Sequence, residues 1–210
     1  MIETLKGIDT KWFLWINGHH CTAMDWTMWV LSQHWFFAAV LVLAFFALTT
    51  RSFQLSPVTF HIEKRGWFVL LAIGLCFLLA DQGSVQLFKN TVGRLRPCHA
   101  LDDVYMFRTG CGGKYGFVSS HAANAFAIVT FLWMRYKKKW SVDSGKWAVR
   151  ITLIGLLVWA LATCYSRAYL GKHYPGDLIC GALFGIVVGL IVWWLCGLIE
   201  KSFLKVKQNE

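Results

Sequence analysis

The chain has 210 residues, of which 57% are hydrophobic and 15% are charged, and its mean hydropathy is +0.50. These values argue against a water-soluble globule and exclude a disordered chain, a collagen and a coiled coil. The 21 basic and 11 acidic residues give a net charge of +10. Because the basic residues fall between long apolar runs, this charge indicates membrane topology and not nucleic-acid binding.

The first twenty residues mix charged and apolar side chains at helical spacing. Four charged residues lie among apolar ones, in the order Glu3, Leu5, Lys6, Ile8, Asp9, Lys11, Trp12, Trp15 and Ile16. The pattern predicts an amphipathic helix over 1–20 that lies in the membrane interface. A cleavable signal peptide is not expected, since it would begin with basic residues and continue as an uninterrupted apolar stretch.

Five apolar runs follow, each close to the roughly 20 residues that a membrane-spanning helix needs. They cover residues 26–50, 66–88, 119–136, 147–169 and 175–199. The runs predict an all-α polytopic integral membrane helix bundle that forms one domain over 1–210. The count is five spans, or six if the N-terminal helix is inserted.

The basic residues predict the orientation of these spans. With five spans, the side that holds the 50–66 and 136–147 loops and the C-terminal tail carries twelve of the 21 basic residues. The positive-inside rule makes this side cytoplasmic and places the 89–118 loop and the 170–175 turn outside. The compact single domain favours a bacterial inner membrane, with the external loop on the periplasmic face.

Seven cysteines are present, and most of them lie in the apolar runs, where cysteine acts as a small hydrophobic residue. Cys98 and Cys111 are different because both lie in the predicted external loop. In an oxidising compartment they would close a short disulfide loop. The alternative is two unpaired thiols.

Ionisable residues collect in three segments at the outer ends of the spans, with the sequences KNTVGRLRP (89–97), FVSSHAANAFA (117–127) and SRAYLGKHYPGD (166–177). Charges near a membrane core are costly and usually mark function. The predicted topology brings six of them to one membrane face: Lys89, Arg96, His121, Arg167, His173 and Asp177.

Each residue also has a purely structural explanation. Snorkelling at the interface would explain Lys89 and Arg96. A charge at a helix end would explain Arg167, and an ordinary i, i+4 contact would explain His173 with Asp177. All these explanations would have to hold together on one face, so a single functional site is favoured.

The residue types indicate phosphoryl transfer, in which a protein positions the phosphorus and neutralises the charge on its oxygens. Lys89, Arg96 and Arg167 supply three fixed cations for that purpose. Backbone N–H groups of Ser120 and His121, at the start of the third span, would add donors for an anion.

Two histidines fit the chemical steps. A neutral His173 held by Asp177 can attack phosphorus, and the carboxylate then stabilises the imidazolium that forms. His121 is the candidate to protonate the departing alkoxide and later to activate water.

The three segments resemble the motifs of the type 2 phosphatidic acid phosphatase superfamily, which includes bacterial acid phosphatases and vanadium haloperoxidases. The first motif, Lys-x6-Arg-Pro, matches residues 89–97, and the third, Ser-Arg-x5-His-x3-Asp, matches residues 166–177. The resemblance implies a phosphohistidine on His173 and no requirement for a metal or another cofactor. Asp102 and Asp103 form the one carboxylate pair that invites a metal argument, and a solvated loop is the favoured interpretation.

The second motif, usually Pro-Ser-Gly-His, appears here as Val118, Ser119, Ser120 and His121, so two positions depart from the pattern. The family uses the backbone amide at the glycine position to bind phosphate, and serine still carries that amide. Ser119 and Ser120 are therefore predicted to bind phosphate, with His121 as the acid.

The predicted function is that of a membrane lipid phosphate phosphatase. Its expected partners are a lipid phosphate substrate and membrane lipids, without nucleic acid, and the sequence does not indicate the oligomeric state. Undecaprenyl pyrophosphate, phosphatidylglycerophosphate and lipid A are all substrates that the family handles. Loop residues 98–118 are expected to select the head group. Gln33 and His34 would either line a groove for the lipid tail or pack between helices, and packing is favoured.

Three alternatives remain. A small transporter would spread its charges along a path through several spans, whereas the cytoplasmic half of each predicted span is apolar. A haloperoxidase would use the same anion pocket for vanadate. A catalytically silent lipid-binding relative is the third alternative, because Val118 and Ser120 depart from the second motif.

Overall fold

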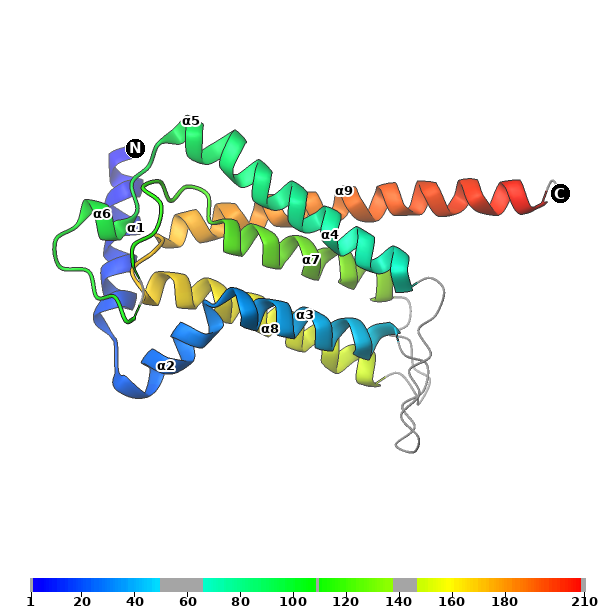
Figure 1. The fold of residues 1–210 in the computed structure, drawn as a ribbon. Helices are drawn as coiled ribbons and strands as arrows, with labels where there is room; N and C mark the ends of the chain where they lie inside the picture. The colour runs from blue at the N-terminus through cyan, green and yellow to red at the C-terminus, as the bar shows by residue number, and fades with distance from the viewer. Residues whose placement is uncertain (1, 50–65, 109, 138–146, 209–210) are drawn as a thin grey trace.

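The computed structural model describes residues 2–49, 66–108, 110–137 and 147–208, and in these residues it is a helical bundle without a strand. Five long helices run along the bundle (Figure 1). They are α3 (His34–Thr49), α4 (Gly66–Gly83), α7 (Ser120–Tyr136), α8 (Trp147–Tyr169) and α9 (Pro175–Gln208). The predicted all-α class is confirmed.

Helix α1 (Ile2–Gly18) lies across one end of this bundle (Figure 1, blue). It confirms the helix predicted over 1–20, and Trp12 and Trp15 are exposed on it. Asn17 is buried and fixes the end of α1, because its amide nitrogen donates to the carbonyl oxygens of Tyr105 at 2.9 Å and Tyr169 at 2.8 Å. The placement of α1 in the membrane interface remains a prediction.

The span predicted over 26–50 is not one helix. It is divided into α2 (Thr22–Leu31) and α3, which meet at an angle of 66°. Ser32, at the break, is buried, and its hydroxyl accepts a hydrogen bond from the guanidinium of Arg167. The prediction of a continuous helix is wrong because apolar composition does not register a break that a distant polar partner stabilises.

The second predicted span continues past residue 88. Helix α4 passes into a π-helical turn, η1 (Ser84–Lys89), and then into α5 (Asn90–Val92). Gly93 has a φ of +61°, a left-handed conformation that glycine adopts without a steric penalty, and it ends the helix. Lys89 therefore lies on a helix and not in the predicted external loop, and π-helical turns are frequent at functional sites.

Helices α7 and α9 pack tightly against each other through small residues. Glycines at four-residue intervals in α9, at positions 181, 185 and 189, face the backbone of α7. A Cβ atom at Gly185 would lie only 2.3 Å from the carbonyl oxygen of Ala123. Small residues at this spacing allow two helix backbones to approach closely within a membrane. The stripe therefore places the first turn of α7 beside the first turn of α9.

Membrane-spanning helices are present, but the described residues do not confirm the predicted number. By length and composition, three helical segments of the described chain can cross a membrane: 66–92, Trp147–Tyr169 and 175–202. The bent pair of α2 and α3 would make a fourth. Helix α7 has 17 residues, at the lower limit for a span. The count of five or six is not confirmed and stays a prediction.

The predicted orientation depends on twelve basic residues, and the structure describes only half of them. Six of the twelve basic residues assigned to the cytoplasmic side lie outside the described residues, namely Arg51, Lys64, Arg65, Lys138, Lys139 and Lys146. The orientation in the membrane therefore stays a prediction.

The segment between α5 and α7 folds back over the end of the bundle that α1 covers (Figure 1). It contains the short helix α6 (Pro97–Ala100) and an isolated antiparallel bridge between Leu95 and Tyr115. A disulfide joins Cys98 to Cys111, with their Cα atoms 5.8 Å apart. This bond selects the first of the two alternatives that the sequence left open.

Candidate active site

The end of η1, the first turn of α7, the last turn of α8 and the first turn of α9 meet at the α1 end of the bundle (Figure 1). A cavity of about 560 Å³, called here the main cavity, lies there. Six of the eight predicted site residues line it: Lys89, Arg96, Ser120, His121, Arg167 and His173. Ser119 and Asp177 are fully buried beside it. The structure thus brings together residues from all three sequence segments.

His173 lies in the turn between α8 and α9, with Asp177 one helical turn farther on. The imidazole Nδ1 is 3.7 Å from Oδ2 of Asp177, and the two side chains are 1% and 0% exposed. The backbone N–H of Tyr174 donates to the same Oδ2 at 3.1 Å and fixes the carboxylate. Burial, with Arg167, Arg96 and Lys89 nearby, holds the pKa of His173 well below its usual value. The imidazole is therefore neutral at pH 7, the form that a nucleophile needs.

Three cations surround the same cavity and are held by different partners. Arg167 is 4% exposed and donates from one terminal nitrogen to Ser32, while its Nε has no hydrogen-bond partner within the described chain. Arg96 donates to the carbonyl oxygens of Tyr115 and Cys111, both at 3.2 Å. Fixed guanidinium groups of this kind suit bidentate contacts to a phosphate.

The two serines of the second motif differ in position. The Ser120 hydroxyl accepts a hydrogen bond from Nζ of Lys89 at 2.6 Å and lies 2.6 Å from the Ser84 hydroxyl. Ser119 does not line the main cavity, and its backbone N–H donates to the carbonyl oxygen of Asp177 at 3.0 Å. The serine at the usual glycine position therefore holds the lysine, whereas Ser119 joins α7 to α9.

His121 is in the first turn of α7, and its Nε2 is buried without a hydrogen-bond partner in the described residues. Its ring lies 5.1 Å from that of His34, centroid to centroid. His34 lines the main cavity, and Gln33 lines a second cavity that adjoins it. Both residues therefore border open space near the site, and His34 also contacts α7 through His121, so the packing role favoured for Gln33 and His34 stays a prediction.

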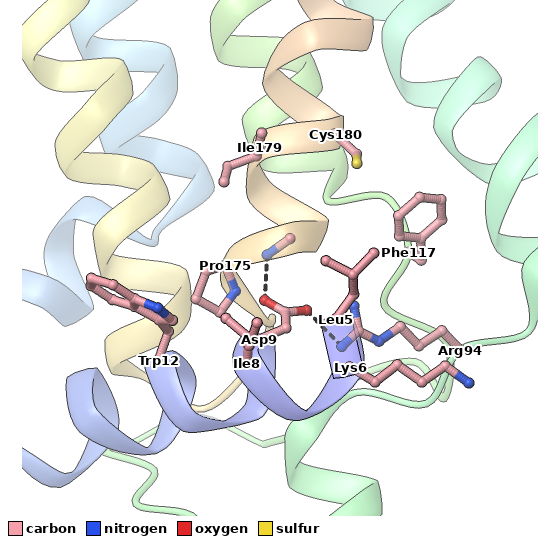
Figure 2. Close-up of a pocket in the computed structure, with 11 residues that line it drawn as sticks. Leu5, Lys6, Ile8, Asp9, Trp12, Arg94, Phe117, Pro175, Ile179 and Cys180 are labelled. Atoms are coloured by element: carbon pink, nitrogen blue, oxygen red, sulfur yellow. Dashed lines mark hydrogen bonds and ion pairs between the residues drawn. The ribbon is translucent and has the colours of Figure 1, made fainter. Parts of the chain in front are cut away.

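Two charged residues outside the predicted set complete the surroundings of Asp177. Arg94 contacts Oδ1 of Asp177 at 2.9 Å and, through its other terminal nitrogen, Asp9 of α1 at 2.7 Å. Asp9 also accepts the backbone N–H of Gly176 at 2.7 Å, and Figure 2 shows it between these two donors. Arg94 lies within the first motif, so its position in the sequence could have identified it as a site residue. No sequence feature could have identified Asp9, because the helical pattern assigned it to the polar face of an interfacial helix.

The wall formed by α4 adds a further acidic residue that the sequence analysis missed. Asp81 lines the main cavity and accepts a hydrogen bond from Nδ2 of Asn124 at 3.3 Å. The sequence could have indicated Asp81, since an ionisable residue within an apolar run usually marks a functional site. The remaining walls from α3 and α4 are apolar, with Phe37, Leu41 and Phe77 among their residues. The main cavity therefore combines a cationic end with an apolar wall, which suits a phosphate that carries a lipid tail.

The candidate metal pair of the sequence analysis does not line the main cavity. Asp102 and Asp103 are exposed in the loop, as a solvated pair would be. In the described residues, no group of three or more histidine, cysteine, aspartate or glutamate side chains has the arrangement of a metal site.

Comparison with known proteins identifies relatives over most of the chain. A lipid A 4'-phosphatase of Bacteroides thetaiotaomicron is 32% identical over 199 residues, covering 93% of this chain and 80% of that protein. A lipid A 4'-phosphatase of Porphyromonas gingivalis is 29% identical and covers 91% of this chain and 74% of its own.

Two solved structures share the fold. A transmembrane PAP2-type phosphatidylglycerolphosphate phosphatase from Bacillus subtilis aligns with a TM-score of 0.60 and 19% identity, covering 94% of this chain and 87% of its own. Aquifex aeolicus LpxE aligns with a TM-score of 0.55 and 22% identity, covering 87% and 93%. The family model described as the PAP2 superfamily matches residues 65–199. The chain belongs to the PAP2 superfamily.

Proposed function

We propose that this integral membrane protein is a lipid phosphate phosphatase with a lipid A phosphate as its substrate. The observation that carries the proposal is the main cavity, where three cations, His173 and His121 surround one space that has an apolar wall. The two relatives described above, both lipid A 4'-phosphatases, favour lipid A over undecaprenyl pyrophosphate and phosphatidylglycerophosphate.

The proposed reaction has two steps. The three cations, Lys89, Arg96 and Arg167, hold the phosphate oxygens, while Nε2 of His173 forms a bond to phosphorus and the bond to the lipid oxygen breaks. His121 gives its proton to that oxygen, and the lipid alcohol leaves. A water molecule then attacks the phosphohistidine, His121 takes a proton from it, and inorganic phosphate is released.

Asp177 and the three cations account for the charge changes in both steps. Nδ1 lies 3.7 Å from the carboxylate, and we propose that this neighbour orients the ring with Nε2 toward the phosphate and stabilises the imidazolium. Because fixed cations neutralise the phosphate oxygens, we propose that the reaction needs no metal. The site is proposed to face the periplasm, on the external side of a bacterial inner membrane.

A direct test is phosphate release by the purified protein in detergent. The assay uses a panel of lipid A, undecaprenyl pyrophosphate and phosphatidylglycerophosphate, each with and without EDTA. We expect lipid A to have the highest kcat/KM and EDTA to leave every rate unchanged. Highest turnover of another lipid would overturn the head-group assignment, and no release from any of the three would favour a transporter or a silent relative.

Arg94 supports the nucleophile indirectly, through Asp177. We expect Arg94→Met to lower kcat about tenfold, because it leaves a buried carboxylate without its counter-charge and so loosens the imidazole. Asp9→Asn keeps an acceptor for the Gly176 N–H and should cost only about twofold to threefold. The measurement is steady-state kinetics beside thermal unfolding, with Arg94→Lys as the charge-preserving control. Equal kcat values for Arg94→Met and wild type would show that Asp177 does not depend on this contact.

A further inference from the structure

A second cavity of about 410 Å³, called here the side cavity, adjoins the main cavity on its loop side. The two share four residues, His34, Arg96, His121 and Arg167. The other lining residues come from the end of α2 and the break after it, from the loop and from the turn after α8: Trp29, Ser32, Gln33, Arg108, Gly112, Gly113 and Lys172. An anion held by the shared arginines would therefore have open space on two sides.

The side cavity is strongly cationic. Four of the side chains that line it are basic, and none of its described lining residues is acidic. Two of the four, Arg96 and Arg167, also line the main cavity, whereas Arg108 and Lys172 do not. Four cations around one space, without a carboxylate, attract an anion from outside the protein.

Lys172 shows most clearly that no acidic residue neutralises the positive charge of the side cavity. It is half-buried, and no carboxylate in the described chain pairs with its ammonium group. Burial, with Arg167 and Arg96 nearby, lowers the pKa of Lys172 to about 8. A desolvated ammonium of this kind gains stability when a ligand brings negative charge to it. Arg108 is held by Trp26, which does not line the side cavity: its guanidinium carbon lies 4.4 Å from the centre of the Trp26 ring.

His121 indicates which part of the substrate reaches the side cavity. It lines both cavities, and the proposed function gives it the proton for the departing lipid oxygen. The group attached to that oxygen therefore lies next to His121. The apolar wall of the main cavity suits the lipid tail, and the polar side cavity suits the rest of the head group.

We propose that the side cavity is a second anion subsite, and that the substrate is a lipid whose leaving group carries a second phosphate. This proposal rests on the proposed activity of a lipid phosphate phosphatase, and it adds a second anionic group to the features that its substrate must carry. The second phosphate can belong to a lipid pyrophosphate or to another position of a sugar head group. Both sources present the same chemistry to Arg108 and Lys172.

The test compares substrates that differ only in the second phosphate. One pair is a bisphosphorylated disaccharide lipid and its monophosphate, and the other is a polyprenyl pyrophosphate and its monophosphate. In the doubly substituted variant Arg108→Gln, Lys172→Gln, we expect KM for at least one two-phosphate lipid to rise about tenfold or more, since each charged hydrogen bond contributes at this level. The values of kcat/KM for the monophosphates should stay within about twofold of wild type. The pair that responds identifies the source of the second phosphate.

Two controls separate this role from general attraction of anions. Lys114→Gln removes an exposed cation of the same loop that does not line the side cavity, and it should leave every KM unchanged. Lys172→Arg keeps the charge and should keep the preference for two phosphates.

Equal losses of kcat/KM on monophosphates and two-phosphate lipids would overturn the subsite. So would unchanged KM values with altered inhibition by inorganic phosphate, which would make the side cavity an exit route. If wild type releases no phosphate from any lipid, the proposed function itself fails.

Discussion

His173→Ala is expected to lower phosphate release by at least about 10⁴-fold, because the proposed covalent route requires its imidazole. The side chain is almost completely buried beside Asp177, yet it also lines the main cavity, so the ring can reach a bound phosphate. The measurement is single-turnover phosphate release, combined with rapid quenching of a reaction that uses ³²P-labelled lipid. Wild type should carry an acid-labile, alkali-stable label, which His173→Ala should lack.

The pH dependence provides a second check on the same residue. A protonated imidazole cannot attack phosphorus, so kcat/KM should fall as the pH drops through the pKa of His173. It should also fall on the alkaline side, where His121 loses the proton that it gives to the departing lipid oxygen. Burial and three nearby cations place this pKa well below 6.5, so the acidic limb should also lie well below 6.5. His19→Ala, which changes an exposed histidine just after α1, is the matched control and should keep both the label and the profile. A labelled His173→Ala protein would contradict the proposed nucleophile.

The predicted cluster of residues at one end of the bundle follows from simple regularities. Apolar runs mark helices that cross the membrane, and consecutive helices alternate in direction, so the ends of adjacent runs share a face. This reasoning alone placed Lys89, Arg96, Arg167 and His173 together, and the structure brings all four to the main cavity. It did not require the angles between helices, because the chain direction alone decides which ends meet.

The departures from regular helix were not predictable in the same way. The bend after α2 and the π-helical turn that carries Lys89 both lie within runs of suitable apolar composition. What stabilises the bend is a contact with Arg167, which is 135 residues away in the chain. Composition records whether a segment prefers lipid to water, and it does not record which distant side chain will contact a bend in the helix.

The acidic residues near the site show a different limit. Asp81 stood out in the sequence as a charge inside an apolar run, and the general cost of such a charge could have identified it. Asp9 had no such signal, because a charged residue on an amphipathic helix ordinarily faces water. Its contacts with Arg94 and Gly176 depend on α1 lying across the end of the bundle, which is a tertiary arrangement.

Gly185→Ala should destabilise the protein by about 3 kcal/mol, since the added Cβ would lie 2.3 Å from the carbonyl oxygen of Ala123 and α7 would have to move away from α9. The stripe at 181, 185 and 189 was visible in the sequence as glycines at four-residue intervals. Within a membrane, such a stripe replaces the hydrophobic effect as the means of holding two helices close. The measurement is thermal unfolding in detergent.

Gly197→Ala is the matched control, because it makes the same change on the same helix where nothing lies within 4 Å of the new Cβ. Alanine is the better helix former, so this variant should be as stable as wild type or slightly more stable. The opposite signs of the two effects separate helix contact from helix propensity. The contact also has a functional consequence, because Ser119 of α7 bonds to the backbone of Asp177 at the end of the same interface. Gly185→Ala should therefore lose activity at temperatures where it is still folded, and wild-type stability for this variant would contradict the close contact between α7 and α9.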